Sequence, residues 1–278
     1  MSRKDKGLIE MLIATFIWGS TPLASIFSNL PSGVFVFFRV VFAFPFILYL
    51  LSKKEGLSTF FAIKPFEYLF LSGFFLALNW ILFFWAIDIA GVNLAVIIYY
   101  GGPIFTIVLA TIFLKEPFNI KILLSIVLVA TGVLLSVGGV DGFNYGSIIA
   151  LFAAISYGFL GFFSKLATTK HSSYKVTAWQ ILIAIIFTLP FAVIQEYSLN
   201  STTIIIVIIT GVIHTALALF LWYDSLKYIA VSIASILAYL DIFFAMILSW
   251  IFLSQIPTTN EIIGSLLIVL AGVIATLL

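Results

Sequence analysis

Apolar runs of membrane-spanning length take up almost the whole of this chain. Ten of them lie near residues 7–28, 33–52, 66–88, 92–114, 119–138, 146–168, 174–194, 202–226, 231–253 and 258–278. Each is close to the roughly 20 apolar residues that an α-helix needs to cross a bilayer. Charged residues make up 9% of the sequence, whereas a soluble globular domain carries about 25%. The sequence therefore predicts an all-α integral membrane protein with ten transmembrane helices in a lipid bilayer.

The segments between these runs are short turns and leave no room for a soluble domain. They carry the expected Pro, Gly and Asp, as at Pro31-Ser-Gly33, Lys115-Glu-Pro117, Asp141-Gly142 and Gln255-Ile-Pro257. The chain has no cysteine and two histidines, His171 and His214, which excludes disulfides and argues against a metal site or a metal cofactor. No phosphate loop of the Gly-x-x-x-x-Gly-Lys type is present, so we expect no direct use of ATP.

The basic residues predict the orientation of the helices. If the N-terminus is cytoplasmic, 12 of the 13 Lys and Arg residues fall at cytoplasmic helix ends and none falls in an outer loop. These twelve are Arg3, Lys4, Lys6, Lys53, Lys54, Lys64, Lys115, Lys121, Lys165, Lys170, Lys175 and Lys227. The slight positive balance is thus explained by topology rather than by nucleic acid. We expect both termini in the cytoplasm and the chain in the inner (plasma) membrane.

The second half of the chain repeats the first at a constant offset, the one that separates Gly146 from Gly7. This repeat offset also aligns Trp18 with Tyr157, Gly19 with Gly158, Leu94-Ala95 with Ile233-Ala234, Ile112-Phe-Leu114 with Ile251-Phe-Leu253, and Glu116 with Gln255. Each half then holds five helices, and an odd number forces the two copies into opposite orientations. The sequence predicts an inverted repeat of residues 1–140 and 141–278, the plan of many secondary transporters.

Several segments together resemble the drug/metabolite transporter superfamily, in its ten-helix form with two EamA-type halves. They are Trp18-Gly19, Ala95 to Pro103-Ile-Phe, Phe113-Leu-Lys-Glu116, residues 145–157, Leu240-Asp-Ile-Phe-Phe-Ala245 and Gly264 to Ala271-Gly-Val273. The resemblance implies export of amino acids or similar small metabolites, commonly driven by the proton gradient as an antiport. Two positions depart from the family pattern. Ile242 replaces a proline usual in the ninth helix, which predicts a stiffer helix there, and Gln255 replaces a glutamate usual at its end.

Arg39 is an ionisable residue about six residues inside the second run. A charge at that depth is costly in a bilayer and calls for a function or a partner. A guanidinium there can bind a substrate carboxylate through two parallel hydrogen bonds. A structural ion pair, or extension of the side chain to the headgroups, is the alternative.

Asp241 and His214 fall near the centres of the ninth and eighth runs. We expect them to lie at one depth on neighbouring helices and to share a hydrogen bond, with Asp241 as the proton-coupling group and His214 assisting it. The alternative is that Asp241 serves folding and that His214 bridges helices. Thr210, His214 and Ala218 form a stripe that favours helix packing.

The segment Tyr99-Tyr-Gly-Gly-Pro103 predicts a break in the fourth helix. Proline removes a backbone donor, and Gly101 and Gly102 allow the chain to bend. Broken helices near the midplane point to a substrate site. We expect a cavity between helices 1, 3, 4, 6, 8 and 9, whose candidate substrate-binding residues are Arg39, Asn79, Trp80, Tyr99, Tyr100, Trp18, Tyr157 and Tyr239, with Gln180 a weaker candidate. For each aromatic residue, packing alone is the alternative.

A secondary transporter of a small molecule is the function that these features favour. A membrane-embedded enzyme would need a His-Glu-x-x-His or Gly-x-Ser-x-Gly motif, and neither is present. A channel or an assembly scaffold is the other alternative, and the inverted repeat speaks against a scaffold. The fifth and tenth helices have no ionisable residue beyond their first turns, which is typical of a peripheral frame or a contact between two copies. The protein is expected to be a monomer or a homodimer.

Overall fold

The computed structural model describes residues 2–137 and 144–277, and every regular element within these ranges is a helix. The helices are α1 (Arg3–Gly19), α2 (Thr21–Ser28), α3 (Ser32–Glu55), α4 (Ser58–Phe61), α5 (Phe66–Ala90), α6 (Val92–Tyr99), α7 (Gly102–Phe113), α8 (Ile120–Val137), α9 (Tyr145–Lys170), α10 (Ser173–Ile194), α11 (Ser201–Ile209), the π-helix η1 (Thr210–Leu217), α12 (Ala218–Ser225), α13 (Val231–Ala238), α14 (Leu240–Leu253) and α15 (Thr259–Thr276). The predicted turn at Asp141-Gly142, and with it the boundary between the two predicted halves, lies outside the described residues.

Nine spans in the described ranges are long and apolar enough to cross a membrane. Four of them consist of consecutive elements, namely α1 with α2, α6 with α7, α11 with η1 and α12, and α13 with α14. A tenth apolar helix, α8, is shorter and matches the predicted run at 119–138. The prediction of an all-α membrane protein is confirmed, and each predicted run corresponds to one of these spans.

Polar residues set many of the helix ends. Ser2, Asn144 and Thr258 each precede a helix and accept a hydrogen bond from the backbone amide three residues later. Asn29 and Ser254 adopt left-handed backbone conformations that end α2 and α14. These caps satisfy backbone groups that have no partner within the helix, which matters where water is scarce.

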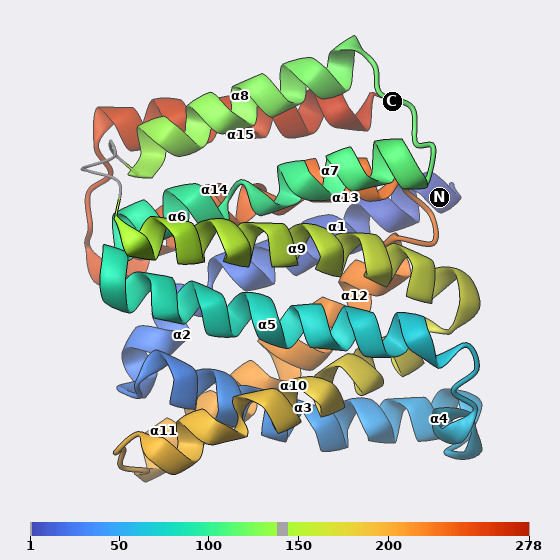
Figure 1. The fold of residues 1–278 in the computed structure, drawn as a ribbon. Coiled ribbons are helices and arrows are strands. Elements are labelled where there is room, and N and C mark those ends of the chain that lie inside the picture. The colour runs from blue at the N-terminus through green and yellow to red at the C-terminus, as the bar shows by residue number, and fades with distance from the viewer. Residues whose placement is uncertain (1, 138–143, 278) are drawn as a thin grey trace.

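The helices form a bundle with two flanking pairs, as Figure 1 shows. On one flank α8 packs along α15, and on the other α3 packs along α10. Between these pairs lie α1, α5, α9 and the broken helices. The α8–α15 contact is close because both helices carry a glycine there: a Cβ atom on Gly264 would lie 2.4 Å from the carbonyl oxygen of Gly132. Small residues of this kind allow helix backbones to approach in a membrane.

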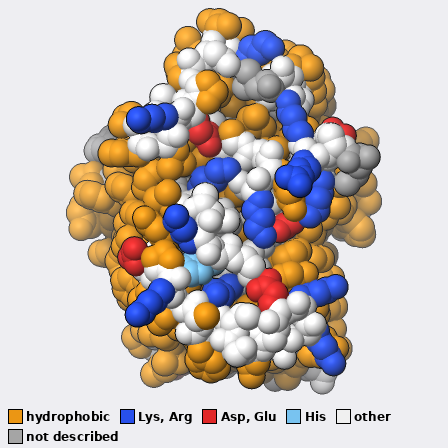
Figure 2. Space-filling model, turned by 90° about the vertical axis from the view of Figure 1, so that its right-hand side faces the viewer, with side chains coloured by type: hydrophobic (Ala, Val, Ile, Leu, Met, Phe, Trp, Pro, Cys, Tyr) orange, Lys and Arg blue, Asp and Glu red, His pale blue; other side chains and the backbone are white. Residues whose placement is uncertain are grey.

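The surface of the bundle divides into an apolar belt and a basic end. Large apolar side chains such as Ile112, Phe113, Ile194 and Ile251 are more than half exposed, as lipid-facing residues are. Lys and Arg side chains gather on the end of the bundle shown in Figure 2. Both termini lie at this same end in Figure 1. We call it the basic end and refer to the opposite one as the far end.

Candidate functional site

A cavity of about 740 Å³ lies in the middle of the bundle. Ten of the residues singled out in the sequence line it, namely Trp18, Arg39, Asn79, Trp80, Tyr99, Tyr100, Pro103, Tyr157, Tyr239 and Asp241. The lining comes from the six predicted spans and also from α3, which the prediction omitted although Arg39 lies on it. Among the described residues, those of α8, α10 and α15 contribute nothing to the lining.

Three of the spans that line the cavity are interrupted at or next to a lining residue. The break between α6 and α7 falls at Tyr100 and Gly101, as predicted from Pro103. α1 ends at Gly19, and α2 starts again after Ser20 with Pro22 in its first turn. The ninth span is interrupted even though Ile242 replaces the proline and was expected to stiffen it: α13 ends at Ala238 and α14 begins at Leu240. Proline is therefore not required for that break.

The glycines of the break do not line the cavity; one of them allows a close contact. A Cβ atom on Gly102 would lie 2.7 Å from Cβ of Tyr157, so only glycine lets α7 pack this tightly on α9. The close approach positions the Tyr157 ring beside that of Tyr99, with 5.6 Å between the ring centroids. Gly101 begins the second part of the broken span, since its carbonyl accepts from the amide of Phe105 at 3.1 Å.

Arg39 is 8% exposed and lies at the wall of the cavity. Its Nε donates a hydrogen bond to Oγ1 of Thr215 at 2.9 Å, and its guanidinium lies 5.3 Å from the ring centroid of Trp80. No carboxylate of the described residues lies within 4.0 Å of it, so the alternative of a structural ion pair finds no partner there. The two terminal nitrogens of the guanidinium likewise find no hydrogen-bond acceptor in the described part of the chain.

Thr215 owes its position to a π-helix that the sequence reasoning missed. η1 has a wider turn than an α-helix, and Thr215 Oγ1 donates to the carbonyl oxygen of Thr210, five residues back. The same hydroxyl oxygen accepts from Arg39. Single π-turns occur often at functional sites. The prediction that Thr210, His214 and Ala218 share one helix face assumed regular α-helical spacing. Nothing in those residue types signals the wider turn.

A group of tyrosines surrounds the break. Tyr99 OH donates to Oδ1 of Asn79 at 2.8 Å, and the Asn79 amide in turn donates to the carbonyl oxygens of its own helix. Tyr239 OH donates to the carbonyl oxygen of Tyr100, and the two rings lie 5.8 Å apart. The hydroxyl of Tyr239 therefore bonds a backbone group at the break in the opposite half.

Asp241 reaches the cavity from the first turn of α14. Its Oδ2 accepts a long hydrogen bond of 3.5 Å from Tyr100 OH. Its Oδ1 is buried and has no hydrogen-bond partner among the described residues. A buried carboxylate oxygen without a donor is costly, which makes it a candidate to take up a proton or to bind a cation.

The expected bond between His214 and Asp241 is not found. His214 Nε2 instead pairs with Oγ of Ser20 at 2.8 Å, and its carbonyl oxygen accepts from the Trp18 indole at 3.2 Å. The reason is that the eighth and ninth spans are not direct neighbours at this level, because α1 packs against η1 and α12 as well as against α13 and α14. His214 is not part of the cavity lining.

Gln180 lies outside the cavity and supports a residue that lines it. Its Oε1 accepts from Tyr223 OH, and its Nε2 donates to Oγ of Ser164 at 3.1 Å. Tyr223 and Trp222 line the cavity and were not among the predicted residues. One signal existed for Trp222, because the repeat offset pairs it with another aromatic lining residue, Phe83.

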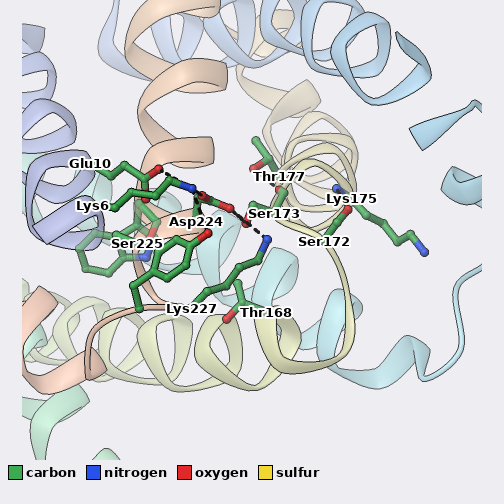
Figure 3. A network of polar contacts seen from close by, with 12 residues as sticks. Lys6, Glu10, Thr168, Ser172, Ser173, Lys175, Thr177, Asp224, Ser225 and Lys227 are labelled. Atoms are coloured by element: carbon green, nitrogen blue, oxygen red, sulfur yellow. Dashed lines mark hydrogen bonds and ion pairs between the residues drawn. The ribbon is translucent and has the colours of Figure 1, made fainter. Parts of the chain in front are cut away.

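A network of charged groups at the basic end is centred on Asp224, the residue that follows Trp222 and Tyr223 in the sequence (Figure 3). Asp224 Oδ2 accepts from Lys6 Nζ at 2.9 Å, and its Oδ1 accepts from Ser173 at 2.8 Å and Lys227 at 3.0 Å. One carboxylate thus joins α1, α10 and the end of α12. The lining residues extend the other way, to Ser25 and Ile26 in α2 and to Ile87 in α5. The cavity is therefore closed toward the basic end and extends toward the far end.

Comparisons with known proteins agree with this architecture. The model of the EamA-like transporter family matches the chain twice, at residues 5–138 and 144–277. The uncharacterized transporter YxxF of Bacillus subtilis (strain 168) is 28% identical over 294 residues, covering 99% of this chain and 90% of YxxF. Protein RarD of Salmonella typhi is 26% identical and covers 93% of this chain and 90% of RarD.

A solved crystal structure has the same fold. It superposes with a TM-score of 0.84 over 99% of both chains, at 17% sequence identity. At this level of identity the likeness shows a shared fold. The two family matches together cover nearly the whole chain. The chain is thus a multi-pass membrane transporter of a small molecule, not an enzyme, and it belongs to the EamA-like transporter family.

Proposed function

We propose that the chain is a secondary transporter that exports amino acids or similar small carboxylate-bearing metabolites across the plasma membrane, coupled to protons through Asp241. Both termini face the cytoplasm in this proposal, and the basic end is the cytoplasmic end. The gathering of Lys and Arg in Figure 2 supports that orientation, because positive residues are retained on the cytoplasmic side.

The observation that carries the proposal is the free guanidinium fork of Arg39 at the cavity wall. Thr215 and the rings of Trp80 and Phe35 hold the side chain in place, while its terminal nitrogens find no acceptor among the described residues. An arginine kept at this depth without a counter-charge is suited to an anion that arrives from outside the protein. A carboxylate matches the fork with two parallel hydrogen bonds.

The remainder of the cavity suits a small amphipathic molecule. Its volume lies within the range of roughly 300–1,000 Å³ typical of small-molecule sites. Trp18, Trp222 and Tyr157 offer aromatic faces, and the Trp18 and Trp222 ring centroids are 5.5 Å apart. Such faces bind apolar groups or a substrate ammonium.

Alternating access by two inverted repeats is supported by pairs of contacts related by the same offset. Gly19 in α1 meets Phe244 in α14, where a Cβ atom would lie 2.6 Å from Cβ of Phe244. Gly158 in α9 meets Phe105 in α7 in the same way, at 2.5 Å. The repeat offset converts the first contact into the second. An inverted repeat predicts such twin contacts, with residues 1–140 and 141–278 as its halves.

Proton coupling is assigned to Asp241 because its Oδ1 is buried and unbonded within the described residues. Proton uptake would remove the cost of the buried charge and supply a hydrogen-bond donor toward Tyr100 or the substrate. His214 assists only indirectly in this arrangement, through Ser20 at the break between α1 and α2. The proton then changes which groups hold the broken helices together.

Purified protein in proteoliposomes tests the proposal. Wild-type protein should show saturable uptake and counterflow of amino acids, and a pH difference alone should concentrate them. Asp241→Asn keeps the shape of the side chain and removes its titration, so it should still exchange substrate but ignore the pH difference. Glu67→Gln, a carboxylate at the basic end of α5 that does not line the cavity, is the control and should behave as wild type. Accumulation driven by pH in Asp241→Asn would contradict the assignment.

A further inference from the structure

Glu116 joins the two halves of the bundle at the basic end. It lies just beyond α7, and both of its carboxylate oxygens bind the first residues of α13. Oε1 accepts from the Val231 amide at 2.9 Å, and Oε2 accepts from the Ser232 amide at 3.0 Å and from the Ser232 hydroxyl at 2.6 Å. A carboxylate at a helix N-terminus is favoured by the exposed amides and by the helix dipole. These bonds connect two of the broken spans that line the cavity.

The far end holds an uncharged residue at the corresponding position. The repeat offset pairs Glu116 with Gln255, which follows α14 as Glu116 follows α7. Gln255 is exposed and lies at a separate, smaller hollow beside α15. An amide cannot make the charge-assisted bonds that a carboxylate makes to backbone amides. The two ends of the bundle are therefore fastened differently.

Repeat-related residues show the consequence of this difference. Ser25 lines the part of the cavity that extends toward the far end, whereas its counterpart Ser164 is fully buried and bonded to Gln180. Val96 also lines the cavity, and its counterpart Ser235 is fully buried in α13. In an inverted repeat, opening the basic end would exchange these environments, so Ser164 and Ser235 mark the pathway that is closed in this structure.

We propose that Glu116 is the latch of the basic end: its carboxylate holds α13 against the end of α7 and sets the balance toward the state that is open at the far end. The equivalence of the two pathways rests on the inverted repeat of the proposed function. Glu116 is a positioning residue in this scheme, because it does not line the cavity. Removing its charge should shift the resting population toward the state open at the basic end.

Cysteine accessibility measures that population directly, since the chain has no cysteine of its own. Ser25→Cys reports the far-end pathway, and Ser164→Cys and Ser235→Cys report the basic-end pathway. Each is labelled with a membrane-impermeant maleimide in right-side-out and in inside-out vesicles. In Glu116→Gln, labelling at positions 164 and 235 should become about tenfold faster, and labelling at 25 slower, as expected for the loss of charge-assisted bonds.

Two variants serve as controls for this experiment. Glu261→Gln removes a carboxylate that accepts hydrogen bonds from Thr258 at the start of its own helix, α15. These bonds stay within one half of the chain, so this variant should leave the labelling rates at positions 25, 164 and 235 unchanged. Ser232→Ala removes one of the three bonds to Glu116 and should give a smaller shift in the same direction. If Glu116→Gln does not fold, the labelling rates of Ser232→Ala test the latch in its place. Unchanged labelling in a folded Glu116→Gln or in Ser232→Ala would overturn the latch.

The outcome is separable from that of the proposed function. If Ser25→Cys reacts only in inside-out vesicles, the proposed orientation fails while the shift caused by Glu116→Gln still decides the latch. If labelling shifts but no amino acid is transported, the substrate proposal fails and the latch stands. A faster reaction at position 164 without any slowing at position 25 would indicate local loosening and would also overturn the latch.

Discussion

Replacing Arg39 by lysine separates charge from shape at the cavity wall. Lysine keeps the positive charge but loses the planar fork and the Nε donor that binds Thr215. A bidentate pair with a carboxylate then becomes a single contact. One charge-assisted hydrogen bond contributes about 1.5–3 kcal/mol, so we expect Arg39→Lys to weaken binding of a carboxylate substrate about 10- to 100-fold.

The assay compares ligands that differ only in the carboxylate. Counterflow of radiolabelled amino acids in proteoliposomes identifies a transported amino acid, which then competes with its decarboxylated amine. Wild-type protein should discriminate strongly between the two, and Arg39→Lys should lose most of that discrimination. Thr215→Val is the matched control, because it leaves the fork intact and removes only the acceptor that orients it. Thr215→Val should weaken the binding of the carboxylate substrate by about 0.5–1.5 kcal/mol.

Thermal unfolding in detergent distinguishes binding from folding. Since the described residues give Arg39 no carboxylate partner, Arg39→Lys should unfold within a few degrees of wild type. A folded variant that keeps its affinity for the carboxylate ligand within about twofold would refute the reasoning. Loss of folded protein instead would assign Arg39 a structural role.

Three further predictions concern topology, packing and pH. Reporter fusions after Asp141, which lies outside the described residues, and after Leu278 should read periplasmic and cytoplasmic, and the same side for both would rule out five helices per half. Gly264→Ala should lower stability by about 1–3 kcal/mol in thermal unfolding, because its Cβ would meet Gly132 at 2.4 Å, whereas Gly272→Ala on the same helix, with its nearest atom at 3.4 Å, should not. Burial lowers the pKa of His171, whose Nε2 donates to the Pro65 carbonyl oxygen. As pH falls, the imidazole therefore takes up a proton more readily in the unfolded chain than in the folded one, so thermal stability should fall as pH drops below about 6.5. His171→Gln should lack that part of the pH dependence.

The spans, and ten of the residues that line the cavity, were predictable from the sequence because they follow from simple rules. Hydrophobic length gives the helices, and a buried ionisable residue or a broken helix needs a reason to exist in a bilayer. Arg39, Asp241 and the Tyr99–Pro103 segment were singled out on these grounds. Each of them lies at the central cavity or at the break beside it.

The partners of those residues were not predictable in the same way. The π-helix brings Thr215 within hydrogen-bond distance of Arg39. Because α1 packs between the eighth and ninth spans, His214 bonds to Ser20 rather than to Asp241. Both outcomes depend on how helices distant in sequence pack, which hydrophobic periodicity does not contain. The break at Tyr239 likewise occurs without proline.

Comparing the two halves residue by residue separates the scaffold from its chemistry. Positions that shape the bundle recur at the repeat offset, such as Gly19 with Gly158 and Tyr100 with Tyr239. The charged side chains of the cavity do not: Arg39 corresponds to Ala178, and Asp241 to Gly102. A repeated scaffold allows the two states to be nearly equal in energy, and only unrepeated groups can give a substrate one orientation within it. The unrepeated charges are thus where specificity and direction are to be sought.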